Sequence, residues 1–288
     1  MQAELDFPQP VFVGGVGRSG THPMGRLLEA DPRYHRIRTE VRFHAHRRGL
    51  PGVCAGEVEV RELARRMRGP WYQRGVNRRQ GLQRLTTRDE LDAALDEFAA
   101  TFAGDRVAAS RVLVSRLLDP SAAEAGKPAW VELTGQVIEQ APFLLELFPD
   151  ARFINMVRDG RAVVAGTLRK VDLTDDPMVA LEKWGRMISA SDAGMRAVPE
   201  DRMLTVHLDD FTAHDREGTF ARLVEFLEIG DPRPMRDYFD REISAERAHV
   251  GAWRERMAPA DARRVDRRYR RLVRSLRRRG ISWAPQAR

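Results

Sequence analysis

Short apolar runs of strand length recur along the chain, separated by longer segments with helical periodicity. Val11 to Val13 form a β-branched and aromatic run, and later runs have the composition of buried strands: Trp130 to Leu133, Phe153 to Val157 and Met203 to Leu208. Because such runs alternate with helical segments, the pattern predicts parallel strands joined by crossover helices. We therefore expect one α/β domain over residues 1–288, with a parallel sheet and helices on both faces.

Helical periodicity is clear in several segments between and after these runs. The first expected helix follows the glycine-rich stretch and ends near Ala30. Further helices are expected at 88–103, from Val137 to Phe148, at 161–171, at 178–197 and from Phe220 to Leu227. The helix at 88–103 is preceded by Thr87 and contains Glu90, which have the spacing of a capping box.

Residues 45–86 are rich in arginine and glycine and have no clear period. Together with the helix at 88–103 they predict a mainly helical insertion over about 45–125. A lid or a partner-binding region fits this segment better than a loop, because long structureless loops are unusual inside domains.

The last segment has a single apolar stripe formed by Val265, Tyr269, Leu272 and Leu276, with arginines around it. Docking of this stripe explains the pattern without any partner. We expect a surface helix with solvated arginines rather than a nucleic-acid interface.

The formal charge of +7 favours anionic partners, such as nucleic acid, a phosphorylated ligand or a membrane surface, without choosing among them. Cys54 is the only cysteine, which excludes an internal disulfide framework and suits a reducing compartment. No stretch has the length of a membrane span, and the first residues lack the pattern of a secretory signal. The expectation is a soluble cytoplasmic protein that does not associate with membranes.

The glycine-rich stretch after the first strand carries the clearest chemical signal. A strand, a loop with Gly14, Gly15, Gly17 and Gly20, and a helix start would aim several backbone N–H groups at one phosphate-like anion. The loop almost fits the P-loop pattern, but Thr21 stands where that pattern requires lysine. A nucleoside triphosphatase is therefore disfavoured, and a P-loop-like kinase remains an alternative.

The cation of this loop lies inside it, at Arg18, and a second basic residue, Arg158, follows the strand that ends at Val157. Ligands of open α/β sheets gather at the carboxyl ends of the strands, so Arg158 and Arg18 can share a cleft. Two anion sites at neighbouring strand ends suit a nucleotide phosphorylated at both ends. The structural alternative is that Arg158 only pairs with Asp159 or caps a carbonyl.

These two stretches resemble the sulfotransferases that use 3′-phosphoadenosine 5′-phosphosulfate (PAPS). Residues Gly17 to Thr21 are similar to their 5′-phosphosulfate loop, and Phe148 to Arg161 to their 3′-phosphate segment. Val206 to Phe211 and Gly251 to Arg254 resemble two later elements of the family. In motif the chain is most similar to the tyrosylprotein sulfotransferases and their bacterial relatives.

The resemblance implies the sulfotransferase fold, PAPS as donor, 3′-phosphoadenosine 5′-phosphate (PAP) as product, no metal, and an insertion that covers the acceptor. It places Arg18 on the leaving nucleotide and Arg254 over the 3′ phosphate. The nucleotide-binding residues that it implies are Gly17, Arg18, Ser19, Gly20, Thr21, His22, Arg158, Gly166, Thr167 and Arg254.

The sequence departs from the family pattern at several of its positions. The serine that follows the 3′-phosphate arginine falls on Gly166, so Thr167 supplies the hydroxyl or the contact is lost. The family's lysine after the middle strand falls on Leu133, and its adenine-side aromatic falls on Pro23. Other residues of this chain must therefore replace the lysine and the aromatic side chain in those contacts.

The resemblance of Thr39 to Arg42 to the base segment of the family implies Glu40 as general base, with His44 as the alternative. Without the resemblance, Glu40 reads as a surface glutamate paired with Arg42 or Arg38, and His44 as a structural histidine. We expect transfer to a hydroxyl of a small-molecule alcohol or phenol. The alternative to an enzyme is a nonenzymatic protein that binds polyanions. Nucleic acid is a less expected partner than a small-molecule acceptor.

Overall fold

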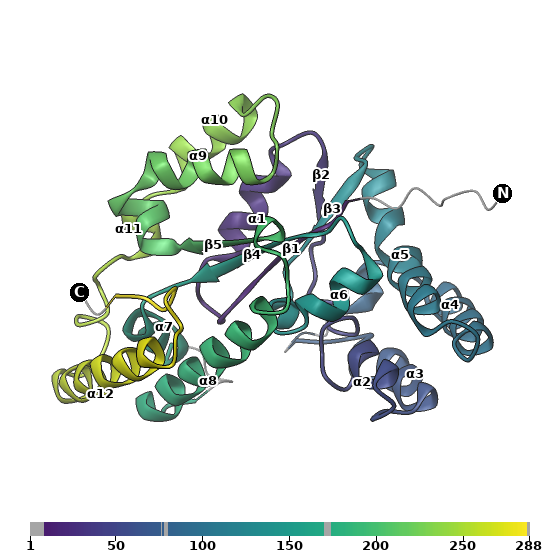
Figure 1. Ribbon diagram of the computed structural model, residues 1–288, viewed down its shortest axis with the longest axis horizontal. Coiled ribbons are helices and arrows are strands. Elements are labelled where there is room, and N and C mark those ends of the chain that lie inside the picture. The colour runs from purple at the N-terminus through teal and green to yellow at the C-terminus, as the bar shows by residue number, and fades with distance from the viewer. Residues whose placement is uncertain (1–8, 76, 78–79, 170–173, 287–288) are drawn as a thin grey trace.

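A parallel sheet forms the centre of the structure (Figure 1). The computed structural model describes residues 9–75, 77, 80–169 and 174–286. Its five-stranded sheet has the order β2-β3-β1-β4-β5, and each of these strand pairs is parallel. The strands are β1 (Val11–Gly15), β2 (Tyr34–Arg36), β3 (Ala129–Glu132), β4 (Arg152–Val157) and β5 (Met203–His207). The predicted α/β fold with a parallel sheet is confirmed.

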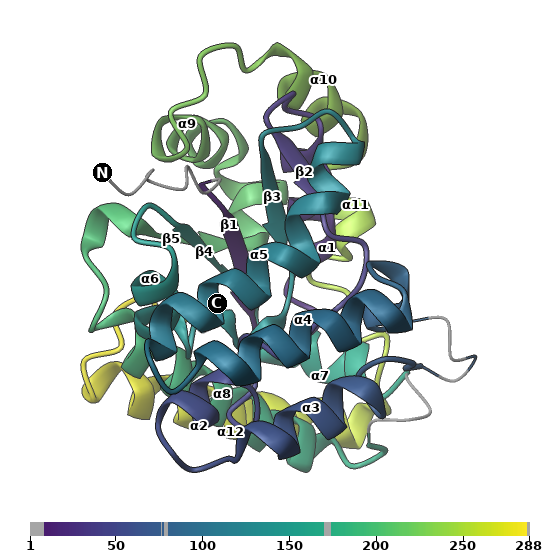
Figure 2. The same ribbon diagram turned by 90° about the vertical axis from the view of Figure 1, so that its right-hand side faces the viewer.

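Helices connect the strands and cover both faces of the sheet (Figures 1 and 2). They are α1 (Thr21–Glu29), α2 (Leu50–Cys54), α3 (Val60–Arg68), α4 (Arg88–Thr101), α5 (Arg106–Glu124), α6 (Ala141–Leu147), α7 (Gly160–Thr167), α8 (Pro177–Met195), α9 (Arg216–Phe226), α10 (Arg233–Glu242), α11 (Ala245–Ala248) and α12 (Pro259–Arg278). Within the described residues, no helix is both long and apolar enough to cross a membrane.

Alternate residues of β1 serve two separate cores, as the period of a strand requires. Val13 packs with Leu27 of α1 on the face that α1, α9 and α10 cover (Figure 1). Phe12 points to the other face, where its ring lies 5.4 Å from that of Trp130 and 5.3 Å from that of Phe153. Burial on both faces holds the central strand in one register.

The insertion folds as the helices α2 to α5, which lie together beside the sheet (Figure 2). Its predicted helix at 88–103 is confirmed as α4, and so is the capping box. The hydroxyl of Thr87 accepts a hydrogen bond from the backbone N–H of Glu90, whose carboxylate accepts one from the N–H of Thr87. The indole of Trp130 donates to Asp119 of α5 at 2.8 Å and ties the insertion to β3.

Several boundaries differ from the sequence-based expectation. Strand β2 was not predicted, because three residues are too short to show a period. The helix expected from Val137 begins only at Ala141, because Val137 and Ile138 pack directly against Gly14 in a 3₁₀ turn. The helix expected at 161–171 ends at Thr167, and its last two positions lie outside the described residues.

A buried arginine holds the C-terminal part of the chain to the sheet. Arg161 is 3% exposed and forms ion pairs with Asp159 at 2.6 Å and with Asp266 of α12. Its guanidinium also lies between two rings, 4.8 Å from the centre of Trp253 and 4.7 Å from that of Tyr269. One side chain therefore joins the end of β4 to α12 and to the segment that precedes it.

We predict that Arg161→Met lowers the free energy of unfolding by about 3–5 kcal/mol, because it leaves the carboxylates of Asp159 and Asp266 without their buried partner. Urea unfolding measures this loss. Arg268→Met is the control, because Arg268 pairs with Glu182 at 3.7 Å on the surface of α12 and should contribute at most about 1 kcal/mol. Equal losses in the two variants would contradict the role of Arg161 as the buried link.

Candidate functional site

The loop between β1 and α1 has the backbone geometry of an anion-binding loop. Gly15 and Gly20 have φ of 126° and 94°, and Arg18 has φ of 71°, so left-handed residues recur through the turn. A Cβ at Gly15 would strike the carbonyl oxygen of Met156, and one at Gly20 would lie 2.7 Å from Leu208. Glycine is required at both positions for the loop to pass so close to β4 and β5.

A pocket of about 340 Å³ opens beside this loop, at the carboxyl ends of the strands. It lies between the start of α1, the ends of β4 and β5, and the turn from α10 to α11. Its lining residues are Arg18, Gly20, Thr21, His22, Pro23, Arg158, Leu208, Thr212, Glu242, Ile243, Ser244, Arg247, Ala248 and His249.

The two basic stretches found in the sequence meet in this pocket. Arg158 donates from Nη1 to the carbonyl oxygen of Arg18 at 3.0 Å and from Nη2 to the carbonyl oxygen of Ala248. Arg158 therefore does cap carbonyls, as the structural alternative held. The carboxylate of Asp159 binds Arg161 instead, which leaves the Arg158 guanidinium facing the pocket.

Three polar atoms at this edge are buried without a partner among the described residues. They are the hydroxyl oxygen of Ser19, a residue that is 0% exposed, Nε of Arg158 and Oδ1 of Asp209. Leaving such atoms unsatisfied costs free energy, and a bound polar ligand would remove that cost. Burial lowers the pKa of Arg158, against the opposing charges of Asp209 and Asp159, which adds to the need for an anionic partner.

His22 stands at the start of α1 and lines the pocket. Burial lowers its pKa, the charges of Arg36 and Arg26 lower it further, and the charge of Glu40 raises it. The imidazole is therefore neutral near pH 7, with one nitrogen able to donate and the other able to accept. This placement agrees with the expected contact between His22 and the 5′ end of a nucleotide.

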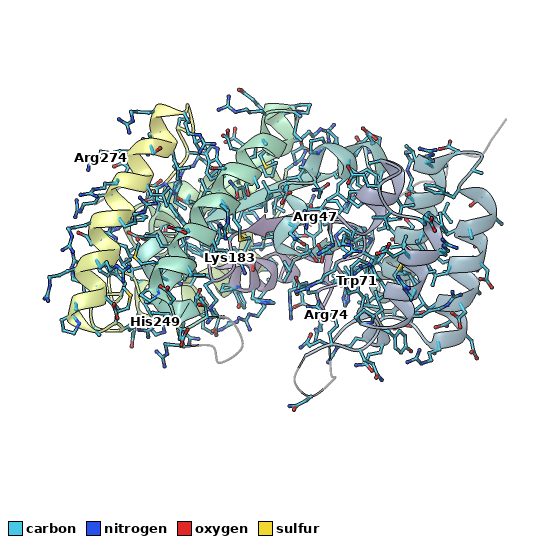
Figure 3. All side chains as sticks on the ribbon, turned by 90° about the horizontal axis from the view of Figure 1, so that it is seen from below. Arg47, Trp71, Arg74, Lys183, His249 and Arg274 are labelled. Atoms are coloured by element: carbon cyan, nitrogen blue, oxygen red, sulfur yellow. The ribbon has the colours of Figure 1, made fainter. Side chains whose placement is uncertain are left out.

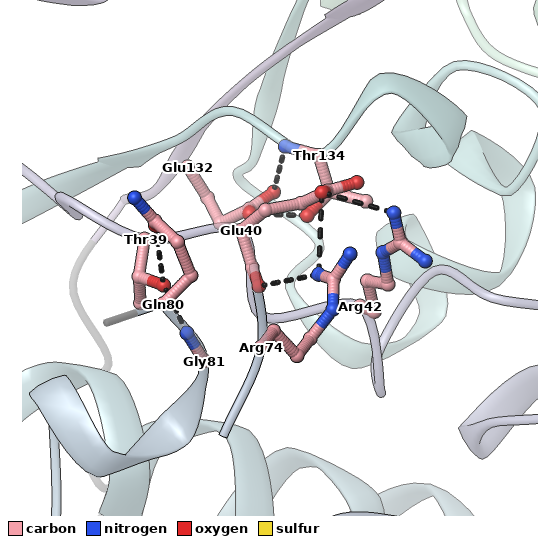
Figure 4. A network of polar contacts seen from close by, with 8 residues as sticks. All are labelled: Thr39, Glu40, Arg42, Arg74, Gln80, Gly81, Glu132 and Thr134. Carbon is pink, nitrogen blue, oxygen red and sulfur yellow. Dashed lines mark hydrogen bonds and ion pairs between the residues drawn. The ribbon is translucent and has the colours of Figure 1, made fainter. Parts of the chain in front are cut away.

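Glu40 lies in a polar network with Arg42 and Arg74 (Figure 4). Its Oε2 accepts from Arg42 at 3.1 Å and from Arg74 at 3.2 Å, and its side chain is 42% exposed. Burial raises the pKa of Glu40, but Arg42 and Arg74 lower it by more, so the pKa lies below its usual value. The surface pair predicted with Arg42 is present, whereas Arg38 pairs with Glu29.

His44 does not reach the pocket, although it follows Glu40 closely in sequence. It is 0% exposed, its Nε2 lies 3.1 Å from a carboxylate oxygen of Glu132, and its ring packs on Phe12. Glu132 also accepts from the backbone N–H and hydroxyl of Thr134. This position corrects the alternative that made His44 the base, because no acceptor hydroxyl can contact a fully buried ring.

Three residues that the sequence predicts to contact the nucleotide do not line the pocket. Gly166 lies beside Arg18, so that a Cβ at Gly166 would be 3.6 Å from its side chain. The hydroxyl of Thr167 donates to the carbonyl oxygen of Val163 at 2.9 Å within α7. Arg254 is exposed, lies over the ring of Trp253 at 4.2 Å, and does not line the pocket.

Sequence reasoning missed the side chains that close the pocket from the C-terminal side. Arg247 and His249 line it, and the charges of Arg256, Arg158 and Arg169 are close enough to lower the pKa of His249, after the larger effect of burial. In the sequence these arginines look like ordinary surface residues of a basic chain. In the described part of the structure, no three His, Cys, Asp or Glu side chains are grouped to hold a metal.

Comparisons with known proteins agree with the motifs. The model of the family described as "Sulfotransferase family" matches residues 10–233. The protein-tyrosine sulfotransferase of Drosophila melanogaster is 25% identical over 224 residues, or 76% of this chain and 38% of that protein. Protein-tyrosine sulfotransferase 2 of Gallus gallus is 27% identical over 224 residues, or 76% of this chain and 51% of that protein.

The chain thus spans about half or less of the length of these relatives. Among solved structures, the sulfotransferase domain from the curacin biosynthetic pathway has a TM-score of 0.54 at 13% identity. The match covers 91% of this chain and 97% of that domain. At this identity the likeness shows the fold alone.

We predict that Arg158→Met weakens the binding of PAP by about tenfold to a hundredfold, the usual contribution of a hydrogen bond to a charged group. Isothermal titration calorimetry measures the affinity. The affinity for adenosine 5′-phosphate, which lacks the 3′ phosphate, should fall much less in Arg158→Met than the affinity for PAP. Arg254→Met is the matched control and should leave PAP affinity unchanged, because Arg254 lies outside the pocket; a loss there and none at Arg158 would reverse the two assignments.

Proposed function

This chain belongs to the sulfotransferase family, and we propose that it transfers the sulfuryl group of PAPS to a hydroxyl, with Glu40 as the general base. One observation carries the proposal. Arg18 and Arg158 line one pocket, and Nε of Arg158 and the hydroxyl of Ser19 in the adjoining loop are buried without a partner among the described residues. Family membership favours this chemistry over the kinase and polyanion-binding alternatives.

The described residues fit a nucleotide with anionic groups at both ends. The loop amides, Ser19 and Arg18 would hold the 5′ phosphosulfate, and Arg158 the 3′ phosphate. The nucleotide supplies an activated sulfuryl group. The residues of this chain orient that group and place positive charge on the oxygens where negative charge develops.

Glu40 would take the proton of the acceptor hydroxyl. Its low pKa keeps the carboxylate ionised at neutral pH, which a base requires. The charges of Glu40 and Arg18 both act on the pKa of His22, so the proposed base and the loop arginine lie in the neighbourhood of one imidazole. This neighbourhood supports the assignment of Glu40, which needs a test by substitution.

For the acceptor we propose a tyrosyl hydroxyl. The sequence alone favours a small-molecule alcohol or phenol, but the relatives named above are protein-tyrosine sulfotransferases. A phenol is the chemical group that the two possibilities share. Radiolabelled PAPS offered with a tyrosine-containing acidic peptide and, separately, with simple phenols and alcohols would decide between them; turnover of the small molecules alone would overturn the peptide proposal.

We predict that Glu40→Gln lowers kcat by about 10²- to 10⁴-fold, the usual range for a general base. Transfer of radiolabelled sulfate measures the rate, and calorimetry measures PAP affinity, which should stay near that of the wild type because Glu40 does not line the nucleotide pocket. Equal losses of rate and affinity would show that Glu40 is structural.

We further predict that Gly166→Ser tightens PAP binding by about threefold to tenfold, the contribution of one added hydrogen bond. A Cβ there would lie 3.6 Å from Arg18, an ordinary contact, so a hydroxyl fits beside the guanidinium. Gly166→Ala is the matched control, because it adds the Cβ without the hydroxyl and should leave affinity unchanged. If alanine tightens binding as much as serine, the hydroxyl has no role.

A further inference from the structure

Arg74 reaches Glu40 from a distant part of the chain (Figure 4). It donates from Nη1 to Oε2 of Glu40 at 3.2 Å and to the main-chain oxygen of the same residue at 3.3 Å. Arg42 donates to the same Oε2 at 3.1 Å. Among the described residues, no hydrogen bond reaches Oε1. One carboxylate oxygen is therefore held twice, and the other is available.

The backbone around Arg74 is itself tied to the segment that carries Glu40. Arg74 and Gln80 form an antiparallel bridge, with N–H···O distances of 2.7 and 3.0 Å. The N–H of Gly81 donates to the hydroxyl of Thr39, which precedes Glu40 and is 4% exposed, at 2.8 Å. Backbone hydrogen bonds therefore fix the segment of Arg74 against the segment of Glu40, so that the two ends of this ion pair are both held in place.

Figure 3 shows where this residue lies in the molecule. Arg74 and His249, which lines the pocket, both lie toward the same edge in this view. Arg74 comes from the insertion and His249 from the segment between α11 and α12. The side chain of Arg74 is only 18% exposed, so the protein has excluded most solvent around its guanidinium.

We propose that Arg74 is a positioning residue for the reaction: it holds Oε2 of Glu40 so that Oε1 receives the acceptor proton. The inference rests on the proposed role of Glu40. In the step, the acceptor oxygen forms a bond to sulfur while its proton passes to Oε1. The bond between sulfur and the donor's phosphate oxygen breaks, and its electron pair stays on that phosphate.

Among the residues that the structure describes, the charged and titratable groups that act on Glu40 are Arg42, Arg74 and His22. Burial raises the pKa of Glu40, the two arginines lower it, and His22 is neutral near pH 7. Arg74 therefore has two separable effects, on the orientation of the carboxylate and on its charge. A substitution that only disturbed the fold would change neither in a defined direction.

The direct test is the titration of the Glu40 side-chain carboxyl, followed by carbon NMR in the full chain with labelled glutamate. Removing the positive charge in R74Q should raise the pKa of Glu40, and R74K should keep it closer to that of the wild type. R61Q is the matched control, since Arg61 pairs with Glu59 on the surface of the same insertion and is 86% exposed. It should leave the titration unchanged.

The kinetic readout is the dependence of kcat on pH. The ionised form of Glu40 is the active base, so kcat falls as the pH drops through its pKa. In R74Q this acid limb should move to higher pH, and the plateau should fall by about tenfold to a hundredfold because only Arg42 then holds Oε2. R74K should recover part of the plateau, and the KM for PAPS should stay near the wild-type value.

An unmoved Glu40 titration in R74Q overturns the proposal, because Arg74 then does not act on that carboxylate. A shifted titration with an unchanged plateau also overturns it, since orientation would not matter. If the wild type transfers no sulfuryl group to any acceptor, the proposed function fails, and Arg74 then loses its part in the reaction even where the NMR titration confirms the ion pair.

Discussion

The parallel pairing of β1 with β4 is the contact on which the rest of the site depends. The two strands run in register from Val11 beside Arg152 to Gly15 beside Met156, so both end at the same edge of the sheet. The glycine-rich loop and the Arg158 turn therefore leave the sheet together, and Arg158 can donate to the carbonyl oxygen of Arg18. The register permits only glycine at position 15, because any Cβ there would strike the Met156 carbonyl. Burial of β1 on both faces then prevents a slip that would separate the two turns.

The same strand end also places the C-terminal wall of the pocket. Arg161 lies three positions after Arg158, in the first turn of α7. It is buried, and its guanidinium lies over the rings of Trp253 and Tyr269. Through these rings it holds the segment after α11, which carries His249 into the pocket. One basic residue of the β4 turn thus lines the pocket, while the other holds the chain segment that closes it. This division of roles explains why Asp159 pairs with Arg161 and leaves Arg158 to the pocket.

The sequence predicts those parts of the site that depend on neighbouring residues, and it does not predict those that depend on contacts between distant segments. Arg18 and Arg158 were found because strand ends and glycine loops leave local patterns, and the fold class followed from the alternation of strands and helices. His44 was misplaced because the chain turns after Glu40: Arg42 has φ of 63°, residues 43–45 form a turn, and the ring of His44 enters the core beside Phe12. Arg254 lies outside the pocket: Trp253 is buried against Arg161, and the next side chain is exposed. Arg74 and Arg247 leave no local pattern, since only the docking of distant segments brings them to the site.

The environment of Glu40 constrains the chemistry that the proposed function would use. A carboxylate whose pKa is lowered by two arginines is always ionised near pH 7, but it is a weak proton acceptor. It cannot remove a proton from a free alcohol or phenol before reaction, because the hydroxyl is far less acidic than the protonated glutamate. Proton transfer becomes favourable only as the acceptor oxygen bonds to sulfur and its proton grows more acidic. The arginines therefore favour a base that acts in the transition state, and such a base depends on orientation more than on proton affinity.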